Sequence, residues 1–172
     1  GIEWARWCVG GTTNIVLNCI DRHRGTSAWE RPYLVWEGED RRAQRSLSYR
    51  EFDAEVCRLA GALRALGVGP GDRVGLYMPN LPETFIAFFA VLKIGAVVMP
   101  LFSGFGPQPL VARLNDGEAK VVLTVDGTWR RTEQIGYAAT DTSETSESGT
   151  KRIFRKVYTV SMLAEVPQQR LL

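Results

Sequence analysis

The sequence has few of the residues that build metal or thiol-based sites. It contains one histidine, His23, which excludes a metal site made of several histidines. A Ser-His-Asp mechanism would have to use this same histidine. Its three cysteines, Cys8, Cys19 and Cys57, form no C-x-x-C pair and are odd in number. We interpret them as reduced, buried thiols of a cytoplasmic protein.

Long hydrophobic runs and an excess of one charge are also absent. The apolar runs reach about ten residues, whereas a membrane-spanning helix needs roughly 20, so we expect no membrane partner. The 21 basic and 19 acidic residues are scattered and leave a net charge of +2, which gives no reason to expect a nucleic-acid partner. No signal peptide is visible and residue 1 is Gly rather than Met, which favours a processed or partial chain.

What the sequence does contain is a regular alternation of helical and strand patterns. We expect short strands over 33–37 and 46–49, a helix from Ser48 to Gly67, and then strands over 73–78, 96–102 and 119–125 with helices over 82–94 and 107–115 between them. The three later strands are continuous apolar runs. Apolar strands that alternate with helices predict an α/β fold with a parallel sheet and helices on its faces.

Local signals mark where these helices begin and end. An S-x-x-E capping box over 48–51 opens the first helix, and Asn80 with Glu83 is expected to cap the second in the same way. Gly67 and Gly95 are expected to end the two helices, because glycine readily adopts the left-handed conformation that follows a helix.

The composition divides the chain into parts. Residues 1–32 have little periodicity and hold Trp4, Trp7 and Trp29, so we expect an irregular segment that wraps around the protein and buries aromatic anchors. Residues 33–131 are expected to form the α/β subdomain.

The remaining residues, 132–172, are expected to be a divergent and partly disordered tail. Residues 138–150 are small, polar and acidic, which is typical of a linker or surface loop. SESGTK (146–151) is similar to a phosphate loop only superficially, because it lacks the first glycine of that motif and has two glutamates beside it. KRIFRKVYTV (151–160) could supply one more strand.

The stretch IGAVVMPLFSGFGP (94–107) ends a predicted strand in a loop that contains Gly104 and Gly106. A glycine-rich loop between a strand and a helix can bind a dinucleotide, but here Pro107 follows at once and the third glycine of that motif is missing. The simpler alternative is that the two glycines only turn the backbone with positive φ.

Two other groups have candidate chemistry. Asp21 with His23 could form an orienting pair for acid–base work, although a structural role is the more common one for such a pair. Arg130 and Arg131 close the last predicted strand, at the edge where open α/β sheets bind ligands. Two guanidinium groups there could grip a phosphate, although an exposed turn also favours basic residues.

Taken together, these pieces resemble the N-terminal portion of the AMP-forming acyl-CoA synthetases of the adenylate-forming ligase superfamily, and within it the acetyl-CoA synthetase group. The resemblance covers about residues 4–131, so it implies an incomplete fold: the N-terminal parallel-sheet subdomain of the ligase. The segments that carry it are WCVGGTTNIVLNCIDRH (7–23), WEGED (36–40), LSYREF (47–52), LGVGPGDRVGLYMPNLPE (66–83), LKIGAVVMPLFSGFGP (92–107) and ARLNDGEAKVVLTVDG (112–127).

The resemblance assigns part of a coenzyme A site. In that family an acid and ATP form an acyl-adenylate with release of pyrophosphate, and coenzyme A then takes the acyl group as a thioester. By this resemblance, Phe102, Ser103 and Gly104 line the approach of the coenzyme A thiol, and Arg130 lies near its 3′-phosphate. The relatives carry a second basic residue a few positions further on, where this chain has Glu133.

The resemblance also indicates what these 172 residues lack. The phosphate loop that ends in Pro-Lys-Gly, the aromatic-Thr-Glu segment, the ribose-binding Asp and the catalytic Lys of the family have no counterpart here, so we expect no catalytic residue and no site for the ATP and magnesium of the parent enzyme. We therefore expect a cytoplasmic fragment that is inactive alone. The alternative is a truncated, non-catalytic protein that associates with itself or with a partner ligase through an exposed sheet edge.

Overall fold

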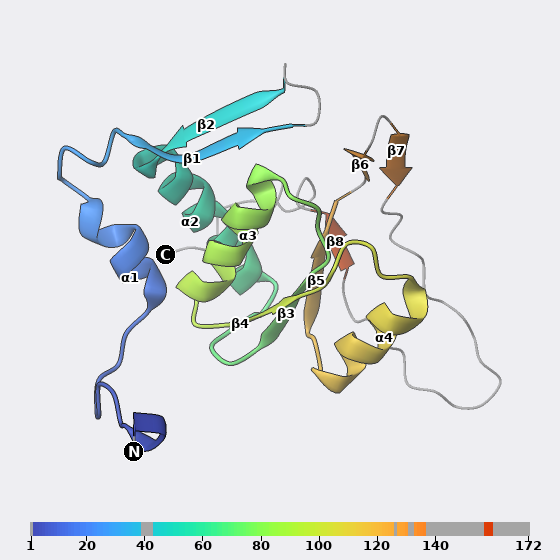
Figure 1. The fold of residues 1–172 in the computed structure, drawn as a ribbon, viewed down its shortest axis with the longest axis horizontal. Coiled ribbons are helices and arrows are strands. Elements are labelled where there is room, and N and C mark those ends of the chain that lie inside the picture. Colours follow the sequence, from blue (N-terminus) through green and yellow to red (C-terminus); the bar gives the residue numbers. More distant parts are fainter. Residues whose placement is uncertain (1, 39–42, 126, 131–132, 137–156, 160–172) are drawn as a thin grey trace.

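A four-stranded parallel sheet lies at the centre of the molecule, with the strand order β4-β3-β5-β8 (Figure 1). The computed structural model describes residues 2–38, 43–125, 127–130, 133–136 and 157–159. The strands of this sheet are β3 (Arg73–Leu76), β4 (Val97–Pro100), β5 (Val121–Thr124) and β8 (Val157–Thr159). The prediction of an α/β fold with a parallel sheet is confirmed.

The other elements surround this sheet. The helices are α1 (Ile15–Cys19), α2 (Tyr49–Ala65), α3 (Pro82–Lys93) and α4 (Pro107–Asp116), with short 3₁₀ turns η1 (Ile2–Trp4) and η2 (Asp21–His23). Two antiparallel hairpins pair β1 (Pro32–Glu37) with β2 (Gln44–Ser48), and β6 (Gly127–Arg130) with β7 (Glu133–Gly136). Within the part of the chain that the structure describes, no helix has the length and hydrophobicity to cross a membrane.

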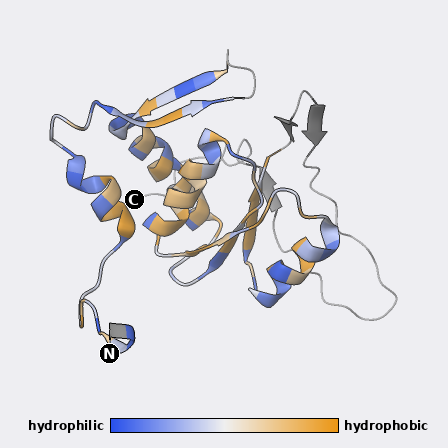
Figure 2. Cartoon of the chain, viewed as in Figure 1, coloured by the Kyte–Doolittle hydropathy of each residue, from blue (hydrophilic) through white to orange (hydrophobic). Residues whose placement is uncertain are grey.

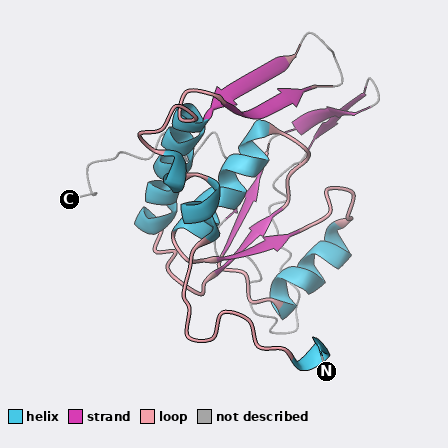
Figure 3. Cartoon of the chain, turned by 60° about the vertical axis from the view of Figure 1, so that its left-hand side comes forward, coloured by secondary structure: helices cyan, strands magenta, loops and turns pink. Residues whose placement is uncertain are grey.

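The two faces of the sheet bury separate hydrophobic clusters. Val121 and Leu123 of β5 belong to the larger cluster, which α2 and α3 complete, whereas Val122 packs with Leu114 of α4 and with Leu101. Because successive strand residues point to opposite faces, α2 and α3 cover one face and α4 covers the other. Figures 1 and 3 show α2 and α3 side by side, with α4 apart from them, and Figure 2 shows hydrophobic residues along α3 and the central strands.

Gly75 of β3 allows α4 to pack closely on the sheet. A Cβ atom at this position would lie 2.7 Å from Leu114 Cδ2 and 3.3 Å from Leu101 Cδ1. Those distances are shorter than normal carbon–carbon contacts, so a larger residue would force the Leu114 and Leu101 side chains to shift. The glycine therefore helps to set the position of α4 and of the loop that precedes it.

The ends of α2 follow the sequence signals. The Ser48 hydroxyl accepts a hydrogen bond from the Glu51 amide, and the Glu51 carboxylate accepts one from the Ser48 amide, so the predicted capping box is confirmed. Gly67 and Gly95 have φ values of +84° and +74°, as expected for the residues that end α2 and α3.

α3 begins at Pro82, as predicted, but its N-terminal cap differs from the prediction. Its N-cap is Leu81, which makes no side-chain capping bond, and Pro82 is the first helical residue. A proline disfavours the helical conformation for the residue before it, so Leu81 is extended and Asn80 lies one position too early to cap the helix. The Glu83 carboxylate pairs instead with Arg45 of β2.

The N-terminal segment is anchored by aliphatic side chains rather than by its first tryptophans. Val16 and Ile20, four positions apart on α1 and its end, are 1% and 0% exposed and belong to the main core. Trp29 packs against this core, but Trp4 and Trp7 are 82% and 79% exposed. The expectation that this segment buries aromatic anchors is therefore wrong for the first two tryptophans, which precede the anchoring turn.

The cysteines are free, but two of them are not buried. Cys8 and Cys57 are exposed and Cys19 is half-buried. Cys8 lies in an exposed turn with φ of +48°, and Cys57 lies on α2 with its thiol directed at a carboxylate rather than at the core. The expectation of buried thiols is wrong for these two residues.

The segment after residue 131 is described in part. β7 begins at Glu133, and β8 lies inside the strand expected over 151–160 and adds a fourth parallel strand beside β5. The strand prediction is confirmed for those three residues. The phosphate-loop-like segment 146–151 and Arg131 lie outside the described residues.

Candidate functional site

The loop over residues 101–106 lies at the carboxyl edge of the parallel sheet. β4 and β5 run parallel on either side of β3, so their carboxyl ends point to the same edge. The loop follows β4 at this edge, and the β6–β7 hairpin follows β5 there (Figure 1). Open α/β sheets bind ligands at this edge. The topology therefore brings Phe102, Ser103 and Gly104 to the same edge as the hairpin that carries Arg130.

The loop is a tight turn with an exposed aromatic side chain. The Phe105 amide donates a hydrogen bond to the Phe102 carbonyl at 2.9 Å, and the two rings meet edge to face with their centroids 5.5 Å apart. Phe102 is nevertheless 61% exposed. A Cβ atom at Gly104 would lie 2.6 Å from the Phe102 ring, so only glycine leaves room for that ring position.

The two glycines of the loop do not act through positive φ. Among the described residues, the glycines with positive φ are Gly10, Gly25, Gly67, Gly71 and Gly95. The interpretation of Gly104 and Gly106 as positive-φ turn residues is therefore wrong. Gly104 instead makes space for the Phe102 ring, and Gly106, with φ of −72°, is the N-cap of α4.

The start of α4 is a poor phosphate site. Helix N-termini bind phosphate through free backbone amides in their first turn. In α4 the first and third residues are Pro107 and Pro109, which have no amide hydrogen to donate. Triphosphate or dinucleotide phosphates therefore do not fit here, in agreement with the missing third glycine.

Two residues that sequence analysis did not single out, Tyr77 and Arg113, contact Phe105 of the loop. The Tyr77 hydroxyl donates a hydrogen bond to the Phe105 carbonyl at 2.8 Å, and the Arg113 guanidinium carbon lies 4.2 Å from the centre of the Phe105 ring. The one available signal was the position of Tyr77, an aromatic residue at the carboxyl end of a predicted strand. Nothing in the sequence indicates that Arg113 of α4 folds back onto the loop.

Arg130 does not end the central strand as expected. β5 ends at Thr124, and Arg130 is the last residue of β6, in a separate hairpin. Its partner in the backbone register is Glu133 of β7. The acidic residue that departs from the family pattern therefore lies opposite Arg130 in the strand pair.

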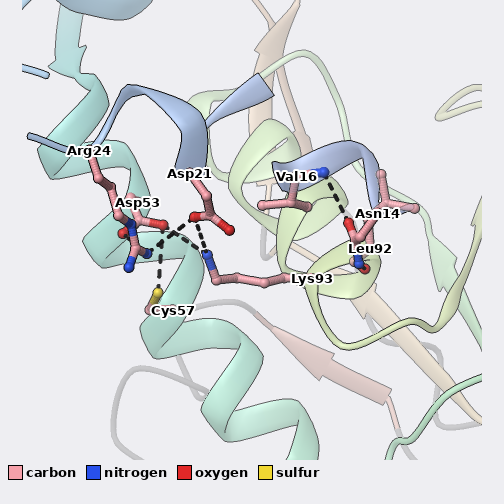
Figure 4. Close-up of polar contacts among 8 residues, drawn as sticks. All are labelled: Asn14, Val16, Asp21, Arg24, Asp53, Cys57, Leu92 and Lys93. Atoms are coloured by element: carbon pink, nitrogen blue, oxygen red, sulfur yellow. Dashed lines mark hydrogen bonds and ion pairs between the residues drawn. The ribbon is translucent and has the colours of Figure 1, made fainter. Parts of the chain in front are cut away.

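Asp21 and His23 do not form an acid–base pair. They lie together in η2, but the His23 ring lies against Tyr49, with 4.7 Å between centroids. The Asp21 carboxylate is 3.1 Å from Lys93 Nζ and 3.2 Å from Arg24 Nη2 (Figure 4). Asp21 and His23 therefore make separate structural contacts, Asp21 with two cations and His23 with Tyr49.

The Asp21 contacts belong to a partly buried ionic cluster that sequence analysis missed. The Asp53 side chain is 10% exposed, and its carboxylate lies 2.9 Å from Lys93 Nζ and 2.6 Å from Arg24 Nη2 (Figure 4). The Cys57 thiol lies 3.7 Å from the same carboxylate. The members come from η2 and its end, α2 and α3, so no local pattern could have predicted them.

Charge pairing decides the protonation state of this cluster. Burial by itself would raise the pKa of Asp53, but hydrogen bonds from Lys93 and Arg24 lower it below its usual value. Burial would lower the pKa of Lys93, but hydrogen bonds to Asp53 and Asp21 raise it. The Asp53 carboxylate and the Lys93 ammonium therefore remain charged and pair with each other, which favours a structural role over a catalytic one. Among the described residues, no group of three or more His, Cys, Asp or Glu side chains is placed to hold a metal ion.

Comparison with known proteins gives one consistent family. The sequence model described as "AMP-binding enzyme" matches residues 21–169, which include the loop and extend past residue 131, where the resemblance described above ends. The chain is 44% identical over 128 residues to the acetyl-coenzyme A synthetase of Mycolicibacterium smegmatis, and 43% identical over 121 residues to that of Methylorubrum extorquens. It is 41% identical over 138 residues to the acetyl-coenzyme A synthetase of Chlorobaculum tepidum.

These matches cover most of this chain but little of the relatives. They include 74%, 70% and 78% of the 172 residues, whereas they span 14%, 18% and 21% of the three synthetases.

Proposed function

Because the chain belongs to the AMP-binding enzyme family, we propose that it forms the first α/β part of an acetyl-CoA synthetase-like ligase and contributes part of a coenzyme A site. The observation that carries the proposal is the exposed Phe102–Phe105 turn, which lies inside the matched region and at the ligand-binding edge of a parallel sheet. The parent reaction joins a short-chain acid to coenzyme A, with ATP converted to AMP and pyrophosphate.

The residues of the turn fit the arm of coenzyme A better than a nucleotide phosphate. The exposed Phe102 ring offers an apolar face to the pantetheine chain, and Gly104 keeps the space beside that ring open. The half-buried Ser103 lies between them and supplies a hydroxyl. These groups bind and orient the arm as it carries the thiol toward the acyl group, and they take no part in proton transfer.

The proposed phosphate contact is weaker. Arg130 would meet the 3′-phosphate of coenzyme A, because a guanidinium matches phosphate oxygens well. Glu133, an acidic residue, is the partner of Arg130 in the backbone register. We expect this residue to reduce the affinity for the 3′-phosphate.

The 172 residues by themselves are not expected to form an acyl-adenylate. They contain no Pro-Lys-Gly phosphate loop, and the start of α4 offers no row of amides in its place. ATP and magnesium would therefore be held by residues outside this chain.

The test is a pair of assays on the purified chain. Acetate-dependent exchange between ATP and pyrophosphate should stay at the level of a protein-free control, and exchange above it would contradict the inactivity. Calorimetry with coenzyme A, ATP and NAD should show weak binding of coenzyme A and weaker or no binding of the other two. Binding of NAD or ATP as tight as that of coenzyme A would favour a nucleotide-binding module instead.

A second candidate function rests on the edge of the sheet. β4 is the end strand in the described sheet, and its Val97 is 47% exposed, so an unpaired strand edge is available to another chain. The chain would then be a non-catalytic partner of itself or of a full-length ligase. Size exclusion with light scattering tests this second candidate function. A chain that is monomeric at all concentrations would argue against a non-catalytic partner protein.

A further inference from the structure

Three contacts converge on one residue behind the exposed turn, Phe105. Its carbonyl accepts a hydrogen bond from the Tyr77 hydroxyl at 2.8 Å. The Arg113 guanidinium carbon lies 4.2 Å from the centre of the Phe105 ring, and this ring and the Phe102 ring pack edge to face. Phe105 is half-buried, whereas Phe102 is largely exposed. The position of the exposed ring therefore depends on the ring behind it.

Tyr77 connects the turn to the rigid part of the molecule. It directly follows β3, and its amide donates a hydrogen bond to the Leu123 carbonyl of β5 at 2.9 Å. Its backbone is thereby held between two central strands of the sheet. The Tyr77 hydroxyl therefore links Phe105, at the end of the turn, to the sheet. The start of the turn is linked to the same sheet, because the Leu101 amide donates a hydrogen bond to the Leu76 carbonyl.

Arg113 connects the turn to α4. Its guanidinium donates to the Pro109 carbonyl at 3.1 Å in the preceding turn of the helix, which orients the planar group over the Phe105 ring. A guanidinium over an aromatic face is attractive because the face of the ring carries negative charge density. The next residue of α4, Leu114, packs against the sheet in the second hydrophobic cluster. Phe105 is therefore held by two separate contacts, one from Tyr77 next to the sheet and one from Arg113 of α4.

We propose that Tyr77 and Arg113 are positioning residues for the coenzyme A arm, acting through Phe105 on Phe102. This inference rests on the proposed function of the turn. Without the two contacts, Phe105 is free to rotate away, and the Phe102 ring loses the edge-to-face contact that fixes it beside Gly104. The arm would then meet a turn that has several conformations, and the binding free energy would include the cost of ordering it.

The first part of the test examines the ligand-free chain by NMR. Tyr77→Phe removes one hydroxyl and keeps the ring, and Arg113→Ala removes the guanidinium. Each variant should shift the amide resonances of residues 102–106 and lower their heteronuclear NOE values, while the melting temperature changes little. Tyr49→Phe and Arg64→Ala are the matched controls, because they remove the same groups from α2. Unchanged resonances of the turn in both Tyr77→Phe and Arg113→Ala would overturn the inference.

The second part measures coenzyme A binding by the same samples. We expect a loss of affinity of about threefold to tenfold in each variant, with partial recovery in Arg113→Lys, which restores the charge but not the planar group. If the wild-type chain binds coenzyme A and the variants bind it equally well, the positioning role is wrong. If the wild-type chain binds no coenzyme A, the proposed function of the turn fails, and the role of Tyr77 and Arg113 toward coenzyme A fails with it. The two failures are thus distinguished by the wild-type titration.

Discussion

Replacing Lys93 with Met should loosen the N-terminal segment from the rest of the molecule. Lys93 Nζ binds Asp53 at 2.9 Å and Asp21 at 3.1 Å, so the one ammonium group joins α2 to η2 (Figure 4). Next to it, the Asn14 side chain donates to the Leu92 carbonyl at 2.7 Å and accepts from the Val16 amide. The end of α3 therefore holds both ends of the short helical segment that carries the buried Val16.

The size of the effect follows from the burial of the pair. Removing one partner of a fully buried ion pair costs about 3–5 kcal/mol, because the other charge is left unpaired. Here the side chains of Lys93 and Asp53 are 20% and 10% exposed, and Arg24 still pairs with Asp53 in the variant. We therefore expect a loss of about 2–3 kcal/mol in unfolding free energy, which corresponds to about 5–10 °C in melting temperature for a chain of this length.

Urea unfolding followed by tryptophan fluorescence measures this loss. The matched control is Lys120→Met, since Lys120 also makes two hydrogen bonds, to Asp72 and to the Gly67 carbonyl, but is 43% exposed. Exposed pairs contribute little because water screens them, so the control should lose clearly less stability. Equal losses in the two variants would show that burial does not make the Lys93 cluster more important than an exposed ion pair.

The difference between wild type and Lys93→Met should also depend on pH. Pairing lowers the pKa of Asp53, so its contribution is complete above the unfolded value of about 3.9 and is lost as pH falls through the lower, folded value. Pairing raises the pKa of Lys93, so that contribution is lost only as pH rises above about 10.4 and through the folded value. A difference that stays constant below pH 3 would contradict the assignment.

Three further substitutions test the loop and its support. Gly104→Ala should displace the Phe102 ring, which its Cβ would meet at 2.6 Å, and weaken coenzyme A binding severalfold with little change in melting temperature; unchanged binding would show that the ring position is unimportant. Gly75→Ala should cost about 1–3 kcal/mol in urea unfolding, because its Cβ would meet Leu114 at 2.7 Å, and a neutral result would mean that α4 shifts freely. Glu133→Lys should strengthen binding of coenzyme A severalfold but leave dephospho-coenzyme A unchanged, since only the former carries the 3′-phosphate. Equal effects on both ligands would contradict the proposed contact between this hairpin and the 3′-phosphate.

The sequence predicts the parts of the fold that depend on local chemistry. The capping box of α2, the glycines that end α2 and α3, and the alternation of apolar strands with helices are all properties of short segments, and the structure has them. The helix begins at Pro82 as expected, but the prediction that Asn80 caps it was wrong, because the proline makes Leu81 the N-cap. The expectation that Trp4 and Trp7 are buried was wrong, because the hydrophobicity of a residue does not determine whether the fold offers its side chain a buried position.

The candidate site shows the same division between local and distant information. A glycine loop after a strand was visible in the sequence, but the reason for Gly104 was not, because it depends on where the Phe102 ring packs. Tyr77 and Arg113 reach Phe105 from 28 and 8 residues away, and the Asp53–Lys93 pair spans 40 residues. Such contacts are set by the tertiary fold, so no sequence pattern could have named their partners.

An NMR titration of the 172-residue chain, followed at the amides of Phe102, Gly104 and Phe105, tests the proposed coenzyme A site most directly. We expect millimolar coenzyme A to shift these amides, dephospho-coenzyme A to shift them nearly as much, and ATP to leave them unchanged, because the proposed contact of the turn is with the pantetheine arm and not with a phosphate. Shifts that are as large with ATP, or the absence of any shift with coenzyme A, would contradict the claim that this turn is part of a coenzyme A site.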